Sequence, residues 1–344
     1  MELKSSLREF LFEDERPFAS CHASTVITFP NGDLLVAYFA GSREGVPDVA
    51  IWCSRKTDGV WSPPYKVADE EGLVHWNPVL FRKRDGQVVL HYKVGRPIPE
   101  WFTRVIVSDD DGKTWSEPAE LVPGDRIGGR GPVKNKLIEL HDGSWLAPAS
   151  LEGAGWRVFA DLSPDQGATW QMSEQAPIVR STDDVPAEIR AKHMVRGAGL
   201  IQPTAWESEP GKVHMLMRST AGFIYRTDSN DGGRTWSTCY KTYLPNNNSG
   251  IDLAKMEDGT LVLAYNPVGM YKGPRMPLLL SASTDNGETW EELLVLEGDT
   301  KTYKLPEGTG EYSYPAVIAE SNRIYVTYTW KRQRIVCWSL ELEA

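Results

Sequence analysis

The chain has 344 residues, of which 41% are hydrophobic and 24% are charged, and its formal net charge is −10. This length can bury a large core, while the acidic excess disfavours binding to nucleic acid or to an anionic membrane surface. Apolar runs stay far shorter than 18 residues, and the first residues lack a basic start followed by an apolar stretch. We therefore expect a cytoplasmic protein without a signal peptide or membrane span. Four cysteines without a CxxC pair predict free thiols.

Six turns, each followed by an apolar strand, divide the chain into six units. In chain order, the turns are Asn31-Gly32, Asp85-Gly86, Asp142-Gly143, Pro210-Gly211, Asp258-Gly259 and Ser321-Asn322. The first unit predicts strands over 23–29, 33–39, 49–54 and 61–67, and the intervening units repeat this plan. The stretch 180–195 lacks a strand pattern, so it predicts an insertion or a short helix before the fourth unit.

The sixth unit predicts only three strands, over 314–319, 323–330 and 334–340. The segment Leu7–Phe12 at the other end of the chain has no unit of its own and can supply the fourth strand. We therefore expect an all-β fold in which residues 1–344 form a single six-bladed β-propeller. Its blades are four-stranded and antiparallel, and the N-terminal strand closes the last blade.

A repeated motif supports this organisation. Four segments read Ser-x-Asp-x-Gly-x-Thr-Trp, beginning at Ser108, Ser163, Ser229 and Ser283, and a degenerate copy begins at Ser54. Successive copies start 54, 55, 66 and 54 residues apart, a period typical of repeat proteins. The aspartate can accept backbone N–H bonds, the glycine supplies a positive φ and the tryptophan packs onto the sheet. The motif thus predicts a hairpin turn with a structural, not catalytic, aspartate.

The propeller topology also predicts where a ligand binds. Inner strands line the central channel, and each is antiparallel to its neighbour, so the start of one and the end of the other lie at the same rim. Rim residues from the inner strands are His22, Asn77, Lys134, Lys136, Gln202, Asn248, Asp252, Glu311, Tyr312 and Tyr314. Those after the second strands are Arg43, Asp48, Lys93, Glu152, Arg218 and Lys331, and Arg275 opens a third strand. Cations gathered at a cleft of an acidic protein indicate an anionic ligand group, most simply a carboxylate held by arginine.

The repeats and the rim resemble the sialidase (neuraminidase) superfamily, and more closely its sialidase-like branch of predicted neuraminidases. The resemblance covers all six units. It implies an active site with an arginine triad, a loop aspartate as acid/base, and a tyrosine nucleophile assisted by a glutamate. Arg43 and Asp48 match the loop arginine and the aspartate five residues after it. Arg275 matches the third arginine, and Tyr312, followed by Ser313, matches the nucleophile.

Three positions depart from the family pattern. His22 stands where the first arginine is expected, and Ile224 where the middle arginine is expected, with Arg218 and Arg226 nearby. Gln202 lies where the assisting glutamate would be wanted. Glu311 adjoins Tyr312, but successive strand residues face opposite ways, so Glu311 is a poor substitute.

Three functions remain open on these residues. In the first, which we favour, a glycoside hydrolase acts on a carboxylated sugar with retention, using Asp48 as acid/base and Tyr312 as nucleophile. Tyr314 shares the face of Tyr312 if the segment is already a strand. In the second, His22 and a tyrosine remove the C5 proton of a uronic acid and act as a lyase.

In the third, the propeller binds glycans without catalysis. Asn248 and Asp252 suit sugar hydroxyls under any of these functions, and Asp252 is an alternative catalytic carboxylate. The remaining histidines are scattered without ligand spacing, so we expect no metal and no cofactor. The expected partner is an acidic sugar or oligosaccharide, and the oligomeric state stays open.

Overall fold

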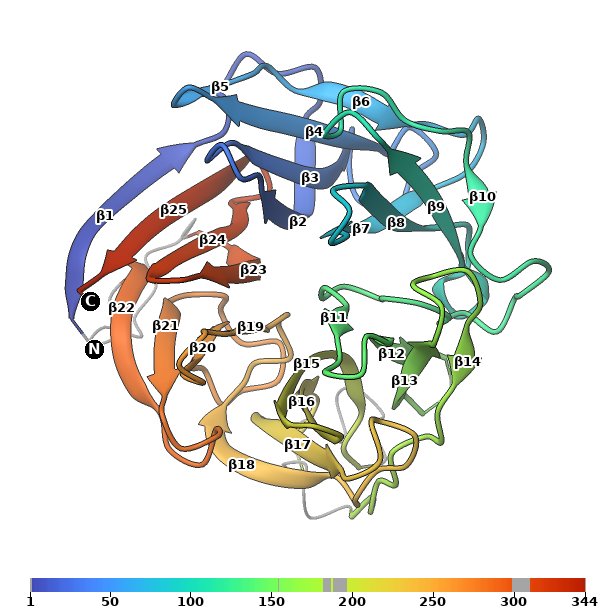
Figure 1. Cartoon of the computed structure of the whole chain (residues 1–344), viewed down its shortest axis with the longest axis vertical. Coiled ribbons are helices and arrows are strands. Elements are labelled where there is room, and N and C mark those ends of the chain that lie inside the picture. Colours follow the sequence, from blue (N-terminus) through green and yellow to red (C-terminus); the bar gives the residue numbers. More distant parts are fainter. Residues whose placement is uncertain (1, 154, 182–186, 188–196, 299–309, 344) are drawn as a thin grey trace.

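The computed structural model describes residues 2–153, 155–181, 187, 197–298 and 310–343. In this part of the chain, six sheets stand around a central axis, with one strand of each sheet innermost (Figure 1). The predicted six-bladed, all-β propeller is therefore confirmed. The predicted insertion or helix over 180–195 lies almost wholly outside the described residues. None of the described helices is long and apolar enough to cross a membrane.

The first three blades follow the predicted order of inner to outer strands. Blade one comprises β2 (Ser20–Thr28), β3 (Leu34–Gly41), β4 (Ala50–Thr57), β5 (Val60–Trp61) and β6 (Tyr65–Ala68). Blade two comprises β7 (His75–Arg82), β8 (Val88–Val94), β9 (Phe102–Ser108) and β10 (Ala119–Glu120), with the 3-10 helix η1 (Ile98–Glu100) before β9. Blade three comprises β11 (Ile138–Glu139), β12 (Trp145–Leu151), β13 (Arg157–Ser163) and β14 (Gln171–Met172).

The other three blades repeat this plan. Blade four comprises β15 (Leu200–Glu209), β16 (Lys212–Ser219), β17 (Phe223–Ser229) and β18 (Tyr240–Pro245). Blade five comprises β19 (Asp252–Lys255), β20 (Leu261–Tyr265), β21 (Leu278–Ser283) and β22 (Glu291–Glu297). Blade six comprises β23 (Tyr312–Glu320), β24 (Arg323–Trp330), β25 (Arg334–Leu342) and β1 (Leu3–Phe10).

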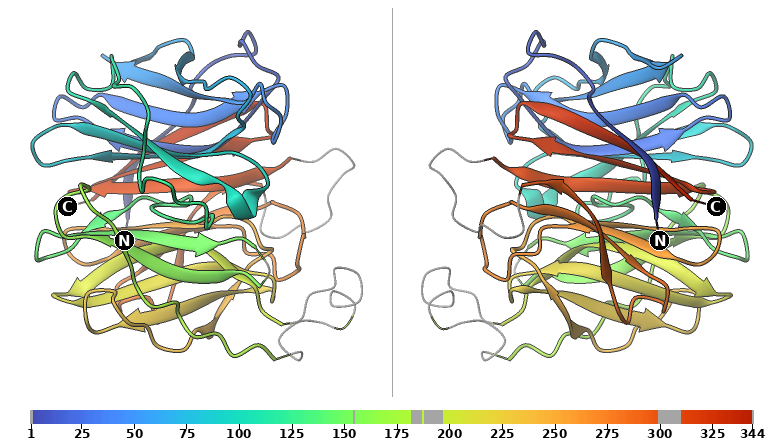
Figure 2. Two further views of the ribbon diagram at one scale, coloured as in Figure 1. Left: turned by 90° about the vertical axis from the view of Figure 1, so that its right-hand side faces the viewer. Right: turned by 90° about the vertical axis from the view of Figure 1, so that its left-hand side faces the viewer.

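The N-terminal strand closes the ring, as predicted. β1 pairs antiparallel with β25, for example Leu7 opposite Ser339, so the strand order is β1-β25-β24-β23. Figure 2 shows the two chain ends at the same side of the molecule. The strand begins and ends earlier than the predicted 7–12, and Leu11 and Phe12 are buried in a hydrophobic cluster beyond it.

Two details differ from the predicted strands. The expected outer strand over 61–67 is split into β5 and β6, because Pro63 and Pro64 cannot donate to the sheet ladder. The inner strand of blade three is reduced to the two residues of β11. Blade three therefore presents largely irregular backbone to the channel before Ile138.

The repeated motif forms the predicted hairpin turns. In blade two, Asp110 Oδ1 accepts the backbone N–H groups of Lys113 and Thr114, and Oδ2 accepts the Thr114 hydroxyl at 2.6 Å. Gly112 has φ 81° and lies against Leu35 of blade one. These hydrogen bonds lower the pKa of Asp110, and the turn packs one blade onto the next. The aspartate is therefore structural.

Candidate active site at the start of the inner strands

The inner strands are distorted where the channel opens. Four non-glycine residues near their starts have positive φ: Ala23 (57°), Asn77 (37°), Gln202 (51°) and Tyr314 (55°). Each lies in a register shift between the inner strand and its neighbour. Such β-bulges re-aim side chains, and left-handed backbone at non-glycine residues costs free energy that the surrounding contacts must offset. Four of the six blades thus have a β-bulge with a left-handed residue at the channel mouth.

Tyr314 lies at the centre of the charged residues at this mouth. Its hydroxyl accepts a 2.8 Å hydrogen bond from Arg218 Nη1. The guanidinium carbons of Arg218 and Arg275 each lie 5.5 Å from the ring centroid, and Lys134 Nζ lies at 5.7 Å. Three basic side chains from three blades therefore surround one partly buried phenol.

His22 packs against Tyr314, with ring centroids 4.1 Å apart. Its side chain is 1% exposed, and Nδ1 lies 2.8 Å from Thr329 Oγ1. The pKa of His22 lies well below its ordinary value, mainly because the side chain is buried. The nearby cations Arg332 and Arg275 lower this pKa further. The imidazole is therefore neutral at physiological pH, and it supports the Tyr314 ring from below the surface.

Glu311 joins two arginines at the edge of the site. Its Oε1 accepts from Arg275 Nη1 at 2.6 Å, from Arg332 Nε at 2.8 Å and from the Ser313 hydroxyl at 2.8 Å. Burial alone would raise the pKa of Glu311, but Arg275 and Arg332 lower it below its ordinary value. Arg332 in turn pairs with Glu44 at 2.6 Å. The loop that contains Glu44 is thereby attached to the site.

A chain of polar contacts leads away from Arg218. Arg218 Nη1 also donates to Gln202 Oε1 at 2.9 Å, and Gln202 Nε2 donates to Glu152 Oε1 at 3.0 Å. Asn248 accepts from the other guanidinium nitrogens through its side chain and its carbonyl. Burial raises the pKa of Glu152, although Arg218 opposes this rise. Arg218 is only 6% exposed, so these contacts fix its direction toward Tyr314.

Lys134 lies beneath the same ring. It is 4% exposed, and Nζ donates to Asn135 Oδ1 at 2.8 Å and to the Ile251 and Pro315 carbonyls. Burial lowers its pKa to about 7. Lys134 therefore ties blade three to blades five and six.

The Arg43–Asp48 pair lies on the exposed loop between β3 and β4. Asp48 accepts from the Ser42 N–H at 3.0 Å and from the Ser42 hydroxyl at 3.1 Å. Within the described residues, Arg43 makes neither a hydrogen bond nor an ion pair. We call Tyr314 and the side chains around it (Arg218, Arg275, Lys134 and His22) the Tyr314 group. The Glu44–Arg332 ion pair places this loop at the border of that group.

Tyr312 does not join the Tyr314 group. It packs in the hydrophobic cluster between blades five and six, and burial raises its pKa, as does the nearby Glu297. The expectation that Tyr312 and Tyr314 share a face is wrong, because the bulge at Tyr314 breaks the alternation of the strand. Glu311 and Tyr312 do face opposite ways, and Glu311 lies on the side of Arg275.

Two other rim candidates, Asp252 and Lys136, have structural contacts away from Tyr314. Asp252 is 1% exposed and accepts from Lys136 at 2.9 Å, from the Thr204 hydroxyl at 2.8 Å and from the Val317 N–H at 2.8 Å. Lys136 also lines a cavity of about 480 Å³ at the opposite end of the channel, where the inner strands end. These two residues crosslink inner strands deeper in the channel.

Lys93 and Asn77 are buried as well. Lys93 is fully buried and donates to the Thr103 hydroxyl at 2.6 Å and to the Arg130 carbonyl at 2.5 Å, and burial lowers its pKa to about 7. Asn77 donates to the Val133 carbonyl at 3.0 Å and is 5% exposed. Neither contact includes Tyr314 or its arginines.

Arg332 also belongs to this edge of the site, although the sequence points to its neighbour Lys331, the first residue after β24. Two consecutive left-handed residues, Lys331 (52°) and Arg332 (59°), turn the Arg332 side chain to Glu311. The only available signal was the position of this loop at the rim. Within the described ranges, no group of three His, Cys, Asp or Glu side chains is arranged to hold a metal ion.

Comparison with known proteins identifies the family. A family model described as a BNR repeat-like domain matches residues 32–326, so the chain belongs to this family. A sialidase from Clostridium perfringens is 29% identical over 104 residues, which are 26% of this chain and 27% of that protein. The chain thus spans about a quarter of the length of this curated relative.

Solved structures share the fold at low identity. A Dyadobacter fermentans protein of unknown function matches with a TM-score of 0.74 and 17% identity, covering 99% of both chains. Trypanosoma rangeli sialidase in complex with the inhibitor DANA matches with a TM-score of 0.71 and 14% identity, covering 98% of this chain and 60% of that one. A point mutant of the NanB sialidase from Streptococcus pneumoniae matches with a TM-score of 0.69 and 14% identity, covering 96% of this chain and 70% of that one. The protein is thus a propeller of the BNR repeat-like family with a sialidase-like fold.

Proposed function

We propose that the protein is a glycoside hydrolase that releases a carboxylated sugar with retention of configuration. The observation that supports this most is the Tyr314 phenol, held by Arg218 at the channel mouth with Arg275 and Lys134 around its ring. Guanidinium groups bind carboxylates through paired hydrogen bonds. Arg275 and Arg332 are the candidate carboxylate ligands, since both reach the partly exposed edge of the site.

We propose Tyr314 as the nucleophile in place of Tyr312. A phenol is neutral before it reacts, so it avoids repulsion with a substrate that carries its own carboxylate beside the anomeric carbon. As the Tyr314 oxygen bonds to the anomeric carbon, its proton passes to a solvent water at the channel mouth, while Arg218 Nη1 keeps its hydrogen bond to that oxygen. Gln202 and Glu152 act through Arg218 and position it. His22 supports the ring.

Asp48 is the proposed proton donor to the glycosidic oxygen. Its loop borders the site through the Glu44–Arg332 ion pair, and two hydrogen bonds from Ser42 hold its carboxylate. The loop is exposed, so a leaving group of variable size can reach it. We propose that a substrate with its carboxylate at Arg275 and its anomeric carbon at Tyr314 presents the glycosidic oxygen to this loop.

Elimination from a uronic acid is the second candidate, because a neutral imidazole lies against Tyr314. However, His22 is 1% exposed, so it cannot touch a substrate without rearrangement. Tyr314 alone would then have to remove the C5 proton. The burial of His22 therefore favours hydrolysis over elimination.

The test is a product screen with the intact chain. Aryl glycosides and oligosaccharides that end in sialic acid or a hexuronic acid are incubated with the protein, beside matched neutral sugars, and products are identified by mass spectrometry. We expect a free carboxylated sugar with water added across the broken bond. An unsaturated uronate would support elimination instead. Absence of any product across the acidic panel would contradict both reactions.

A further inference from the structure

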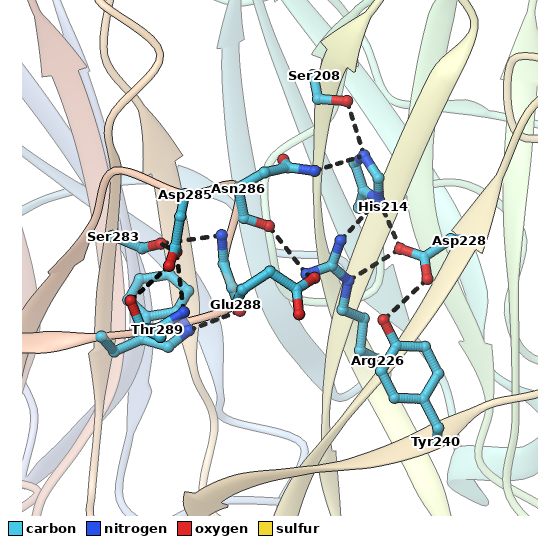
Figure 3. Close-up of polar contacts among 12 residues, drawn as sticks. Ser208, His214, Arg226, Asp228, Tyr240, Ser283, Asp285, Asn286, Glu288 and Thr289 are labelled. Atoms are coloured by element: carbon cyan, nitrogen blue, oxygen red, sulfur yellow. Dashed lines mark hydrogen bonds and ion pairs between the residues drawn. The ribbon is translucent and has the colours of Figure 1, made fainter.

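A Ser–His–Asp arrangement lies outside the proposed glycosidase site, on the face of blade four that meets blade five (Figure 3). His214 Nε2 lies 2.8 Å from Ser208 Oγ, and His214 Nδ1 lies 2.5 Å from Asp228 Oδ1. Hydrolases on unrelated folds use this order of hydroxyl, imidazole and carboxylate to activate a serine. The three residues therefore have the contacts of a nucleophile, a general base and a group that orients the base.

Strand pairing brings these side chains together. Trp206 of β15 lies opposite His214 of β16, and His214 lies opposite Asp228 of β17, so the three share one face of the sheet. Ser208 is the extra residue in a bulge between Glu207 and Glu209 near the end of β15. Bulges of this kind re-aim a side chain. The serine is partly exposed, whereas His214 is 7% exposed.

The imidazole is fixed on both sides. Trp206 stacks on it with a centroid distance of 4.9 Å and an interplanar angle of 25°. Asp228 also accepts from Arg226 Nε at 2.9 Å and from the Tyr240 hydroxyl at 2.9 Å. Burial alone would raise the pKa of Asp228, but hydrogen bonds from His214 and Arg226 lower it to about 2. The ionised carboxylate favours a proton on Nδ1, so that Nε2 is the acceptor nitrogen facing the Ser208 hydroxyl at 2.8 Å, with Asn286 Nδ2 also near it at 3.3 Å.

Arg226, the cation near the His214 imidazole, also pairs with two carboxylates. Arg226 Nη2 lies 3.2 Å from His214 Nδ1. The same guanidinium also pairs with Asp228 at 2.9 Å and with Glu288 at 3.1 Å. Two carboxylates thus offset its charge when the imidazole becomes protonated.

An amide donor lies next to the serine and histidine. Asn286, in the repeated turn of blade five, has φ 59°, and its Oδ1 accepts from Trp206 Nε1 at 2.7 Å. This contact turns Nδ2 toward His214 Nε2, at 3.3 Å. The amide nitrogen carries a second N–H, and an amide donor close to the carbonyl oxygen of an ester can stabilise the oxyanion of an acyl-transfer intermediate. The donor comes from a different blade, so the arrangement depends on the packed seam.

We propose that Ser208, His214 and Asp228 form a second catalytic site, one that hydrolyses carboxylic esters with a small acyl group. Ser208 Oγ bonds to the carbonyl carbon while its proton passes to His214 Nε2, and Asn286 donates to the resulting oxyanion. The intermediate then expels the alcohol, which takes that proton. A water molecule then attacks the carbonyl carbon of the acyl-serine and gives a proton to His214 Nε2. The carboxylic acid is released, and the proton returns to Ser208 Oγ. The acyl group is small because Ser208 is only partly exposed.

The test uses the intact chain and a fluorophosphonate probe, which bonds to activated serines, with the labelled residue located by peptide mass spectrometry. We expect an adduct on Ser208, its loss in Ser208→Ala, and labelling slowed a hundredfold or more in Asp228→Asn, where the orienting carboxylate is gone. Hydrolysis of an aryl acetate should fall in parallel. Ser144→Ala is the matched control, because the Ser144 hydroxyl bonds to Asp142 in an exposed turn.

Unfolding midpoints identify variants that fail to fold, and His214→Gln replaces Asp228→Asn if that variant is unstable. Glycosidase activity should be unchanged in Ser208→Ala, since Ser208 lies outside the Tyr314 group. The proposal is overturned if wild-type protein carries no adduct on Ser208. It is also overturned if a folded Asp228→Asn or His214→Gln variant is labelled at the wild-type rate.

Discussion

Arg218 and Tyr314 lie 96 residues apart in the chain and on different blades, and they meet through a 2.8 Å hydrogen bond at the channel mouth. The fold fixes the direction of both side chains. Arg218 is held by Gln202 and Asn248, and Tyr314 is directed inward by a left-handed backbone. Strained backbone next to a buried guanidinium is typical of a site whose geometry serves function.

Replacing each tyrosine by phenylalanine separates the two candidates for the nucleophile. Tyr314→Phe should abolish turnover of carboxylated glycosides, because the attacking oxygen and the hydrogen bond to Arg218 are lost. Tyr312→Phe should retain activity within a fewfold, since that ring packs between blades five and six. Steady-state kinetics on both variants checks this. Loss of activity in Tyr312→Phe, with Tyr314→Phe active, would assign the role to Tyr312.

Arg275→Ala tests the carboxylate clamp. We expect kcat/KM for a carboxylated substrate to fall by a factor equivalent to about 2 kcal/mol, the scale of a charge-assisted hydrogen bond. Glu311 keeps Arg332 as a partner, so the fold should survive. Kinetics on a carboxyl-reduced substrate is the control. If the variant discriminates between charged and neutral substrate as well as the wild type, Arg275 does not bind the carboxylate.

Asp252 should prove structural. Asp252→Ala leaves Lys136 without its ion-pair partner and removes bonds to Thr204 and Val317. We expect the free energy of unfolding to fall by about 3 kcal/mol, as for a broken buried pair. Denaturant titration measures the loss, and Asp252→Asn, which keeps a hydrogen-bond acceptor, should lose less. A stable Asp252→Ala protein without glycosidase activity would instead make Asp252 catalytic.

Buried Lys93 makes stability depend on pH. Its pKa is lowered from 10.5 to about 7 by burial. Between these values the unfolded chain binds more protons than the folded one, so the free energy of unfolding should rise with pH through this window. The contribution is at most about 1.4 kcal/mol per pH unit. Urea titrations at pH 7, 8 and 9 should show a smaller rise in Lys93→Met than in wild type, and equal slopes would refute the assignment.

The sequence allowed the blade count, the closing strand and the turns to be predicted, because each depends on local patterns of apolar strands and turn residues. It did not allow the choice between Tyr312 and Tyr314. That choice rests on a bulge at a non-glycine residue, which tertiary contacts hold against its local backbone preference. Arg332 was missed for the same reason, since its direction depends on Glu311 and Glu44.

Other rim residues were placed on the correct strands but face structural partners. The sequence favours Lys136 as a rim cation for an anionic group and Asp252 as a ligand of sugar hydroxyls, yet these two side chains lie 2.9 Å apart and form an ion pair. Lys93 was expected at the rim and is fully buried. The position of a residue along its strand predicts which end of the channel it approaches. Which side chain of another blade it contacts depends on how the blades pack, and the spacing of residues in the sequence does not specify this.

The most direct test of the central claim is to trap the glycosyl enzyme. The intact protein is incubated with a panel of fluorinated sialosyl and uronosyl fluorides, in which fluorine beside the anomeric carbon slows hydrolysis of the intermediate, and its peptides are analysed by mass spectrometry. We expect one carboxylated sugar to be bound covalently to Tyr314, with no adduct in Tyr314→Phe. An adduct on Tyr312, or turnover without any covalent adduct together with an unsaturated product, would contradict the account.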